Sequence, residues 1–127
     1  MKMVAAAAAL LASLAGAGCT TGVVQPQGKI GMTGEATLAQ VTDAIQQAGL
    51  EAGWQTKLVR PGLIEGYREW GNGKHNMTVE VVYDAKNYTI KYKDSKNLSY
   101  DGGSIHRQYW IRVQAWDDAI KARTWKL

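Results

Sequence analysis

The amino-acid sequence predicts an α+β fold: a four-stranded antiparallel sheet with an N-terminal and a C-terminal helix packed on one face. Two stretches with apolar residues at helical spacing enclose four stretches rich in β-branched and aromatic residues. The last two of these four alternate apolar and polar residues, which is typical of a sheet with one covered face. Two layers in the order α-β-β-β-β-α bury all the apolar faces most simply.

The N-terminal helix is expected to begin at Thr33, a residue type that caps helices. Glu35 would then place a negative charge in the first turn, where the helix dipole favours it. Gly49 or Gly53 can end the helix. The apolar stripe that we assign to the core consists of Leu38, Val41, Ile45, Ala48 and Ala52.

Four strands are expected next, separated by turn residues. Pro61-Gly62 lies between the first two, and Gly71-Asn72-Gly73 follows the second. The linker 84–87 has the length of a hairpin loop, so the last two strands should pair directly. The expected strands are residues 54–59, 63–70, 77–83 and 88–93.

The C-terminal helix is expected to be capped by Ser104 and to run to about Arg123. Asp117 and Lys121 stand four residues apart in the order that supports a helix. The apolar stripe consists of Ile105, Tyr109, Val113, Trp116 and Ile120.

The first eighteen residues have the pattern of a secretory signal peptide. Lys2 precedes an apolar run over 3–15, which is shorter than the ~20 residues needed to span a bilayer, and small residues then lead to Cys19. The alternative is an ordinary signal peptide that leaves Cys19 as a free thiol on a soluble periplasmic protein.

Residues 14–19, Leu-Ala-Gly-Ala-Gly-Cys, resemble the lipobox of bacterial lipoproteins. The resemblance implies that Cys19 carries fatty acids such as palmitate and becomes the mature N-terminus, so that the lipid anchors the protein in a membrane. Thr20, where an Asp would retain the protein in the inner membrane, implies the outer membrane. We therefore expect a signal peptide over 1–18, a flexible lipid-anchored tether over 19–32 and one domain over 33–127.

The composition excludes several function classes. The chain has 127 residues, one cysteine, two histidines and a formal net charge of +4. It is too short for a multidomain enzyme, has no pair of cysteines for an internal disulfide, and has too small a basic excess to suggest nucleic-acid binding. We find no enzyme motif and no metal-ligand spacing, and we expect neither a cofactor nor a metal.

The segment before the C-terminal helix is the main candidate for a ligand site. With Ser104 as the cap, His106 and Arg107 would oppose the dipole of the first helical turn. These two side chains and the backbone N–H groups of Gly103 and Ser104 could hold an anion or a cell-wall fragment. The structural alternative pairs Arg107 with Asp101 or Asp94. His106 is also the residue that a small periplasmic enzyme would use.

Two apolar residues fall off the stripe of the C-terminal helix. Trp110 and Ile111 are either covered by another element or offered to a partner, so they form a possible partner surface.

The motif Tyr100-x-Gly102-x-x-Ile105-His106-Arg107-x-Tyr109, with the strands before it, resembles a group of small uncharacterised proteobacterial envelope lipoproteins. The resemblance covers about residues 54–120 and the lipobox, and it implies no activity. Our expectation is a non-catalytic accessory or binding protein of the envelope that faces the periplasm and contacts an envelope protein or a cell-wall component.

Overall fold

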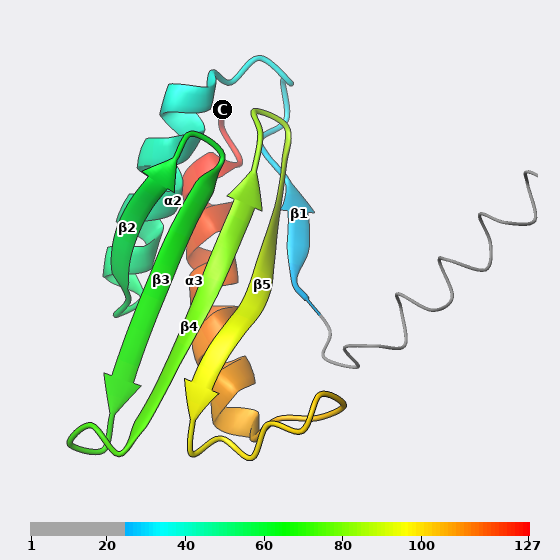
Figure 1. Cartoon of the computed structure of the whole chain (residues 1–127). Helices are drawn as coiled ribbons and strands as arrows, with labels where there is room; N and C mark the ends of the chain where they lie inside the picture. The colour runs from blue at the N-terminus through cyan, green and yellow to red at the C-terminus, as the bar shows by residue number, and fades with distance from the viewer. Residues whose placement is uncertain (1–24) are drawn as a thin grey trace, which may run out of the picture.

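The computed structural model describes residues 25–127, so the predicted signal peptide and Cys19 lie outside the described part. One antiparallel sheet has the strand order β1-β5-β4-β3-β2, and both helices cover the same face of it (Figure 1). The elements are β1 (Gln27–Lys29), α2 (Leu38–Glu51), β2 (Gln55–Arg60), β3 (Leu63–Trp70), β4 (His75–Tyr83), β5 (Asn87–Lys96) and α3 (Arg107–Thr124). The expected α+β class with two helices is confirmed.

The sheet has five strands rather than the expected four. The additional strand, β1, lies in the segment 19–32 that the sequence assigned to a flexible tether. Gln27 stands opposite Thr89 on β5, and the amide of Ile30 donates to the carbonyl of Lys86 at 2.7 Å. The Gln-Gly-Lys sequence of β1 has no alternation of apolar and polar residues. The strand is held by main-chain hydrogen bonds, which leave no pattern in the sequence, and it was therefore not predicted.

Helix α2 begins four residues later than predicted, because Thr37 caps it rather than Thr33. The Thr37 hydroxyl accepts from the amide of Gln40 at 3.1 Å, and the Gln40 side chain accepts from the amide of Thr37 at 2.8 Å. This reciprocal capping box satisfies two otherwise unpaired donors. The hydroxyl of Thr33 instead donates to the carbonyl of Leu127 at 3.0 Å, and so joins the segment before α2 to Leu127.

The core lies between the helices and the sheet and is centred on two tryptophans. Trp54 and Trp116 are buried with ring centroids 5.1 Å apart, and the indole N–H of Trp116 donates to the carbonyl of Ile45 at 3.0 Å. The Trp116 ring packs directly on Gly66 of β3. Most of both predicted stripes is buried as expected: Val41, Ile45, Ala48, Tyr109, Val113, Trp116 and Ile120.

The opposite face of the sheet is open and charged. Lys93 forms an ion pair with Glu65 at 2.8 Å and approaches Glu80 at 3.8 Å. At one margin, β2 pairs on one side with β3, and its outer edge has no strand partner in the described sheet. This edge carries Lys57, an irregularity between Leu58 and Arg60, and Pro61 just beyond its end.

Candidate functional site

The start of α3 differs from the prediction by two residues, because His106 rather than Ser104 is the N-cap. The His106 Nδ1 accepts from the amide of Gln108 at 3.1 Å, and the backbone N–H of His106 donates to the carbonyl of Leu98 at 2.7 Å. An accepting Nδ1 carries no proton, so the ring caps the helix as a neutral imidazole. The conflict with the helix dipole that the sequence suggested at His106 is thereby removed.

Asp101 takes up the amides that were expected to hold an external anion. Its Oδ1 accepts from the backbone N–H groups of Gly103 at 2.8 Å and Ser104 at 2.7 Å, and the Ser104 hydroxyl also points to it. These two backbone hydrogen bonds hold the pKa of Asp101 below its usual range. Arg107 is the first residue of α3, and it takes part in none of the ion pairs found within residues 25–127. The structure therefore separates Arg107 from the carboxylate that organises this loop.

The possible partner surface divides into two different environments. Ile111 is 49% exposed, whereas Trp110 is half-buried and packs edge-on against Tyr109 with ring centroids 5.0 Å apart. Trp110 also borders a depression of about 670 Å³ between α3 and the start of β1. Its lining residues are Pro26, Gln27, Trp110, Gln114, Asp117 and Lys121.

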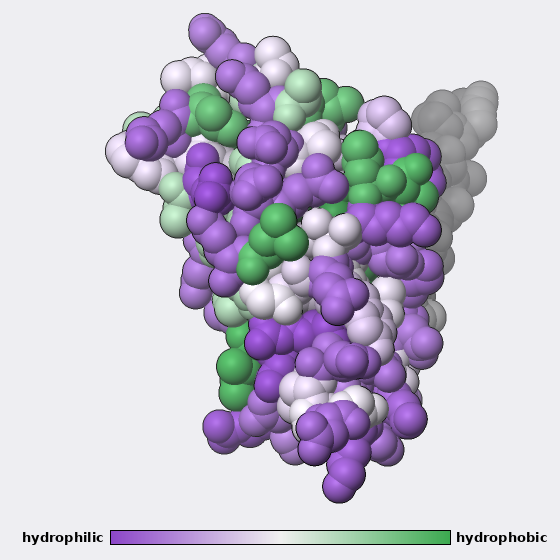
Figure 2. Space-filling model, turned by 90° about the vertical axis from the view of Figure 1, so that its left-hand side faces the viewer, coloured by the Kyte–Doolittle hydropathy of each residue, from purple (hydrophilic) through white to green (hydrophobic). Residues whose placement is uncertain are grey.

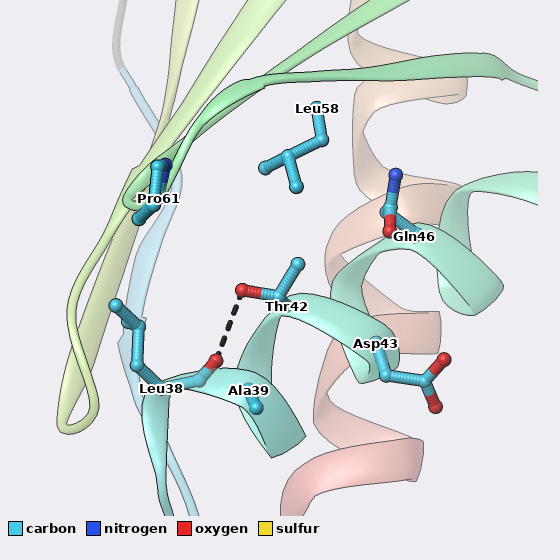
Figure 3. Close-up of a pocket in the computed structure, with 7 residues that line it drawn as sticks. All are labelled: Leu38, Ala39, Thr42, Asp43, Gln46, Leu58 and Pro61. Atoms are coloured by element: carbon cyan, nitrogen blue, oxygen red, sulfur yellow. Dashed lines mark hydrogen bonds between the residues drawn. The ribbon is translucent and has the colours of Figure 1, made fainter.

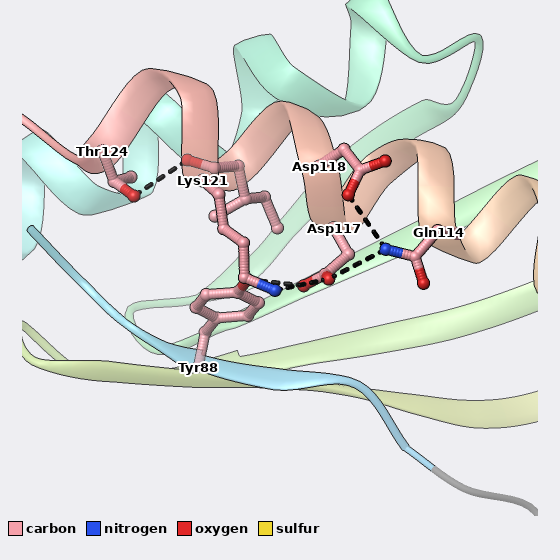
Figure 4. A network of polar contacts seen from close by, with 7 residues as sticks. Tyr88, Gln114, Asp117, Asp118, Lys121 and Thr124 are labelled. Atoms are coloured by element: carbon pink, nitrogen blue, oxygen red, sulfur yellow. Dashed lines mark hydrogen bonds and ion pairs between the residues drawn. The ribbon is translucent and has the colours of Figure 1, made fainter.

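A buried carboxylate forms the polar side of this depression (Figure 4). Asp117 is only 3% exposed, and it accepts from the Tyr88 hydroxyl at 2.5 Å and from the Lys121 ammonium at 2.7 Å. Burial and the neighbouring carboxylate raise the pKa of Tyr88. The predicted Asp117–Lys121 pair is confirmed, and the added bond to Tyr88 fastens α3 to β5.

A second depression, of about 380 Å³, lies between α2 and β2 (Figure 3). Its walls are mainly apolar, with Leu38 and Pro61 on one side, and the Thr42 hydroxyl donates to the carbonyl of Leu38 at 2.9 Å. On this side of the molecule, apolar side chains form separate islands in a hydrophilic surface (Figure 2). The depression offers no cluster of titratable groups, since Asp43 is the one ionisable residue among those that line it.

Sequence reasoning missed a pair of arginines near the end of β3. Arg112 of α3 lies over the ring of Trp70, with its Cζ 3.8 Å from the ring centroid, and Arg68 precedes Trp70 by two residues on the same face of β3. The available signal was the alternation within residues 63–70, which puts Arg68 on the face of Ile64. A charged residue on the helix-facing side of β3 indicates that the space between sheet and helices is not purely apolar at this end of the strand.

Residues 25–127 contain no group of three or more His, Cys, Asp or Glu side chains placed to hold a metal ion. No helix in this part of the chain has the length and apolar character needed to cross a bilayer. No protein-family model matches the chain, and no curated protein has a significantly similar sequence.

Proposed function

We propose that this protein is a lipid-anchored, non-catalytic binding module of the bacterial envelope, held at the outer membrane with its domain facing the periplasm. The observation that carries the proposal is the lipobox-like sequence ending in Ala17-Gly18-Cys19, directly after an apolar run of signal-peptide length. Acylation of Cys19 with more than one chain gives stable membrane attachment without a spanning helix.

The short distance along the chain from Cys19 to the first strand supports a membrane-proximal role. Even fully extended, the backbone between Cys19 and Gln27 can span at most about 29 Å. A domain attached in this way meets partners that lie at the membrane surface, such as other envelope proteins or the nearby cell wall.

The environment of His106 supports the non-catalytic part of the proposal. A general base needs a proton to abstract and a group that orients its ring. The Nδ1 atom of His106 is occupied by the amide of Gln108, and the nearby carboxylate of Asp101 is occupied by backbone amides. Both groups therefore have a structural task in this loop.

Cys19→Ser in the full chain tests the anchor. We expect the parent protein in the membrane fraction and Cys19→Ser in the soluble periplasmic fraction, with fatty acids found by mass spectrometry on the N-terminal peptide of the parent alone. Thr20→Ser is the matched control, since it makes a small change beside the cysteine and should leave the anchor intact. An unmodified parent that fractionates like Cys19→Ser would contradict the proposal.

Crosslinked capture from cells tests the partner surface. Because Trp110 packs on the core, the double change Trp110→Ala and Ile111→Ala is accompanied by Ile111→Ala alone, which removes only an exposed side chain. Leu50→Ala on α2 is the control for loss of an exposed apolar residue elsewhere, since Leu50 is 56% exposed. Loss of the same envelope partner in both Ile111 variants, with retention in Leu50→Ala, is the expected result, and identical captures from all variants would remove α3 as the interface.

A further inference from the structure

Two arginines point into the space between the sheet and the helices. Arg68 lies opposite Met77 in the β3–β4 register, and Met77 is fully buried on the helix-facing side. Arg112 comes from α3 and stacks on Trp70, which stands two residues after Arg68 on the same face. The two guanidinium groups therefore occupy one region, where β3 ends beside the first half of α3.

Neither guanidinium has a carboxylate partner in the described part of the chain. Arg68 donates through Nη1 to the carbonyl of Ala52, and Arg112 donates through Nη1 to the side chain of Gln108. The hydrogen bonds of both guanidinium groups run through Nη1 alone, and the buried Nε of Arg112 has no acceptor within residues 25–127. Burial and the charge of Arg68 lower the pKa of Arg112.

The surrounding backbone offsets only part of this charge. Ala52 is the C-cap of α2, and a helix carboxyl end carries roughly half of a negative elementary charge. Arg68 lies at this helix end and Arg112 lies close enough to Arg68 to feel its charge, so the two half-buried guanidinium groups leave an excess of positive charge, and the buried Nε of Arg112 lacks a hydrogen-bond acceptor. An anion from outside the chain would remove this imbalance.

We propose that Arg68 and Arg112 form a binding site for a phosphate group. Planar guanidinium forks suit phosphate, whose oxygens can accept from two forks at once and whose charge of about −1.5 to −2 at pH 7 matches two guanidinium groups, whereas a carboxylate carries a single charge. The Arg112 guanidinium stacks on the Trp70 ring and is already held in place. Less side-chain entropy is therefore lost when the anion binds. This site is distinct from the Asp101 loop, whose amides are already bonded.

Two sources could supply a phosphate group with this chemistry. β1 pairs with the first three residues of β5, Asn87–Thr89, so it lies away from the end of the sheet at which β3 and β5 terminate (Figure 1). If Cys19 is anchored as proposed, the domain stays near the membrane surface, and one source is the phosphate of an anionic lipid headgroup. The other source is a soluble phosphomonoester in the periplasm.

A titration of the full chain carrying Cys19→Ser, in nonionic micelles, tests the site without a lipid anchor. The probes are inorganic phosphate and glycerol 3-phosphate at constant ionic strength, followed by the indole N–H signal of Trp70 and the Nε–H signal of Arg112 in ¹H–¹⁵N spectra. We expect saturable shifts, and we expect Arg112→Gln and Arg68→Gln each to weaken binding at least about tenfold. Arg60→Gln, the same change at an exposed position on β2, should leave the affinity unchanged.

The same chain is then added to lipid nanodiscs that contain phosphatidic acid or only phosphatidylcholine. Saturation by the soluble probes identifies a site for soluble phosphate, and a response confined to phosphatidic acid identifies a headgroup site. Shifts that chloride reproduces, or an equal loss of affinity in Arg60→Gln, would overturn the proposal, as would no response in either arm. If Arg112→Gln does not fold, Arg68→Gln decides the outcome. Failure of the Cys19 fractionation test leaves this result unaffected, since the chain used here carries no lipid.

Discussion

Gly66→Ala places a methyl group where the structure has no room for one. A Cβ at this position would lie 2.3 Å from Cζ3 and 2.7 Å from Cη2 of Trp116. The ring cannot move aside easily, because Trp116 is fully buried, is bonded to Ile45 and is stacked beside Trp54.

Overpacking a core in this way costs about 1–3 kcal/mol. Replacing a strand glycine by alanine returns about 0.5–1 kcal/mol through backbone entropy. We therefore expect Gly66→Ala to lower the free energy of unfolding by about 1–2 kcal/mol. For a domain of this size, that loss corresponds to a decrease in Tm of about 5–10 °C.

Urea denaturation followed by circular dichroism measures this loss. The control is Gly103→Ala, because a Cβ there meets only Asp101, whose Oδ1 would be 3.7 Å away, in ordinary contact. Combining Gly66→Ala with Trp116→Leu, which removes the clashing atoms, should show a clear interaction energy in a double-mutant cycle. Unchanged stability of Gly66→Ala, or simple additivity with Trp116→Leu, would refute the packing argument.

Four further predictions follow from the polar groups and the N-terminal sequence. Asp117→Asn should lower the free energy of unfolding by about 1–3 kcal/mol in urea, since buried charge-assisted hydrogen bonds are weakened; an unchanged midpoint would contradict the network. The pKa of Asp101 is lowered in the folded state, so its stabilising effect is present above the unfolded pKa of about 3.9 and is lost as the pH falls through the folded value. An NMR titration of the Gly103 amide should therefore have its midpoint below 3.9, and a midpoint at or above that value would contradict the assignment. His106→Ala should cost about 0.5–2 kcal/mol through loss of the helix cap, and His106→Asn, which can still cap, should cost less; equal losses in thermal unfolding would exclude the capping role. Thr20→Asp should move the protein from the outer to the inner membrane in density-gradient fractions, and no redistribution would count against the lipoprotein sorting that the sequence implies.

The regular elements were the predictable part of this fold. The apolar stripes and the alternating strands follow from one-sided burial, which repeats along each element and therefore leaves a pattern in the sequence. Strand β3 matches the predicted range 63–70 residue for residue. The capping box of Thr37 was also visible in the sequence, since Gln40 stands three residues after Thr37 whereas Ala36 stands three residues after Thr33, so the pattern favoured Thr37.

The features that were missed depend on contacts between distant parts of the chain. Strand β1 is held by backbone pairing with β5, and side-chain patterns in the sequence do not reveal such pairing. The burial of Asp117 depends on Tyr88, which comes 29 residues earlier and meets it only after the sheet and α3 have packed. The proximity of Arg68 and Arg112 also depends on tertiary packing, because Arg68 belongs to the sheet and Arg112 to the helix layer.

The outer edge of β2, which has no strand partner in the described sheet, matters most when many copies of the protein share one membrane. Molecules anchored as proposed diffuse in two dimensions with similar orientations, so that their sheet margins collide far more often than in free solution. An open, regular strand would then recruit the next copy by backbone pairing and begin a fibre. Lys57, the displaced backbone near Val59 and the missing N–H of Pro61 each disfavour that pairing, so this edge does not join neighbouring copies when the domain is crowded on a surface.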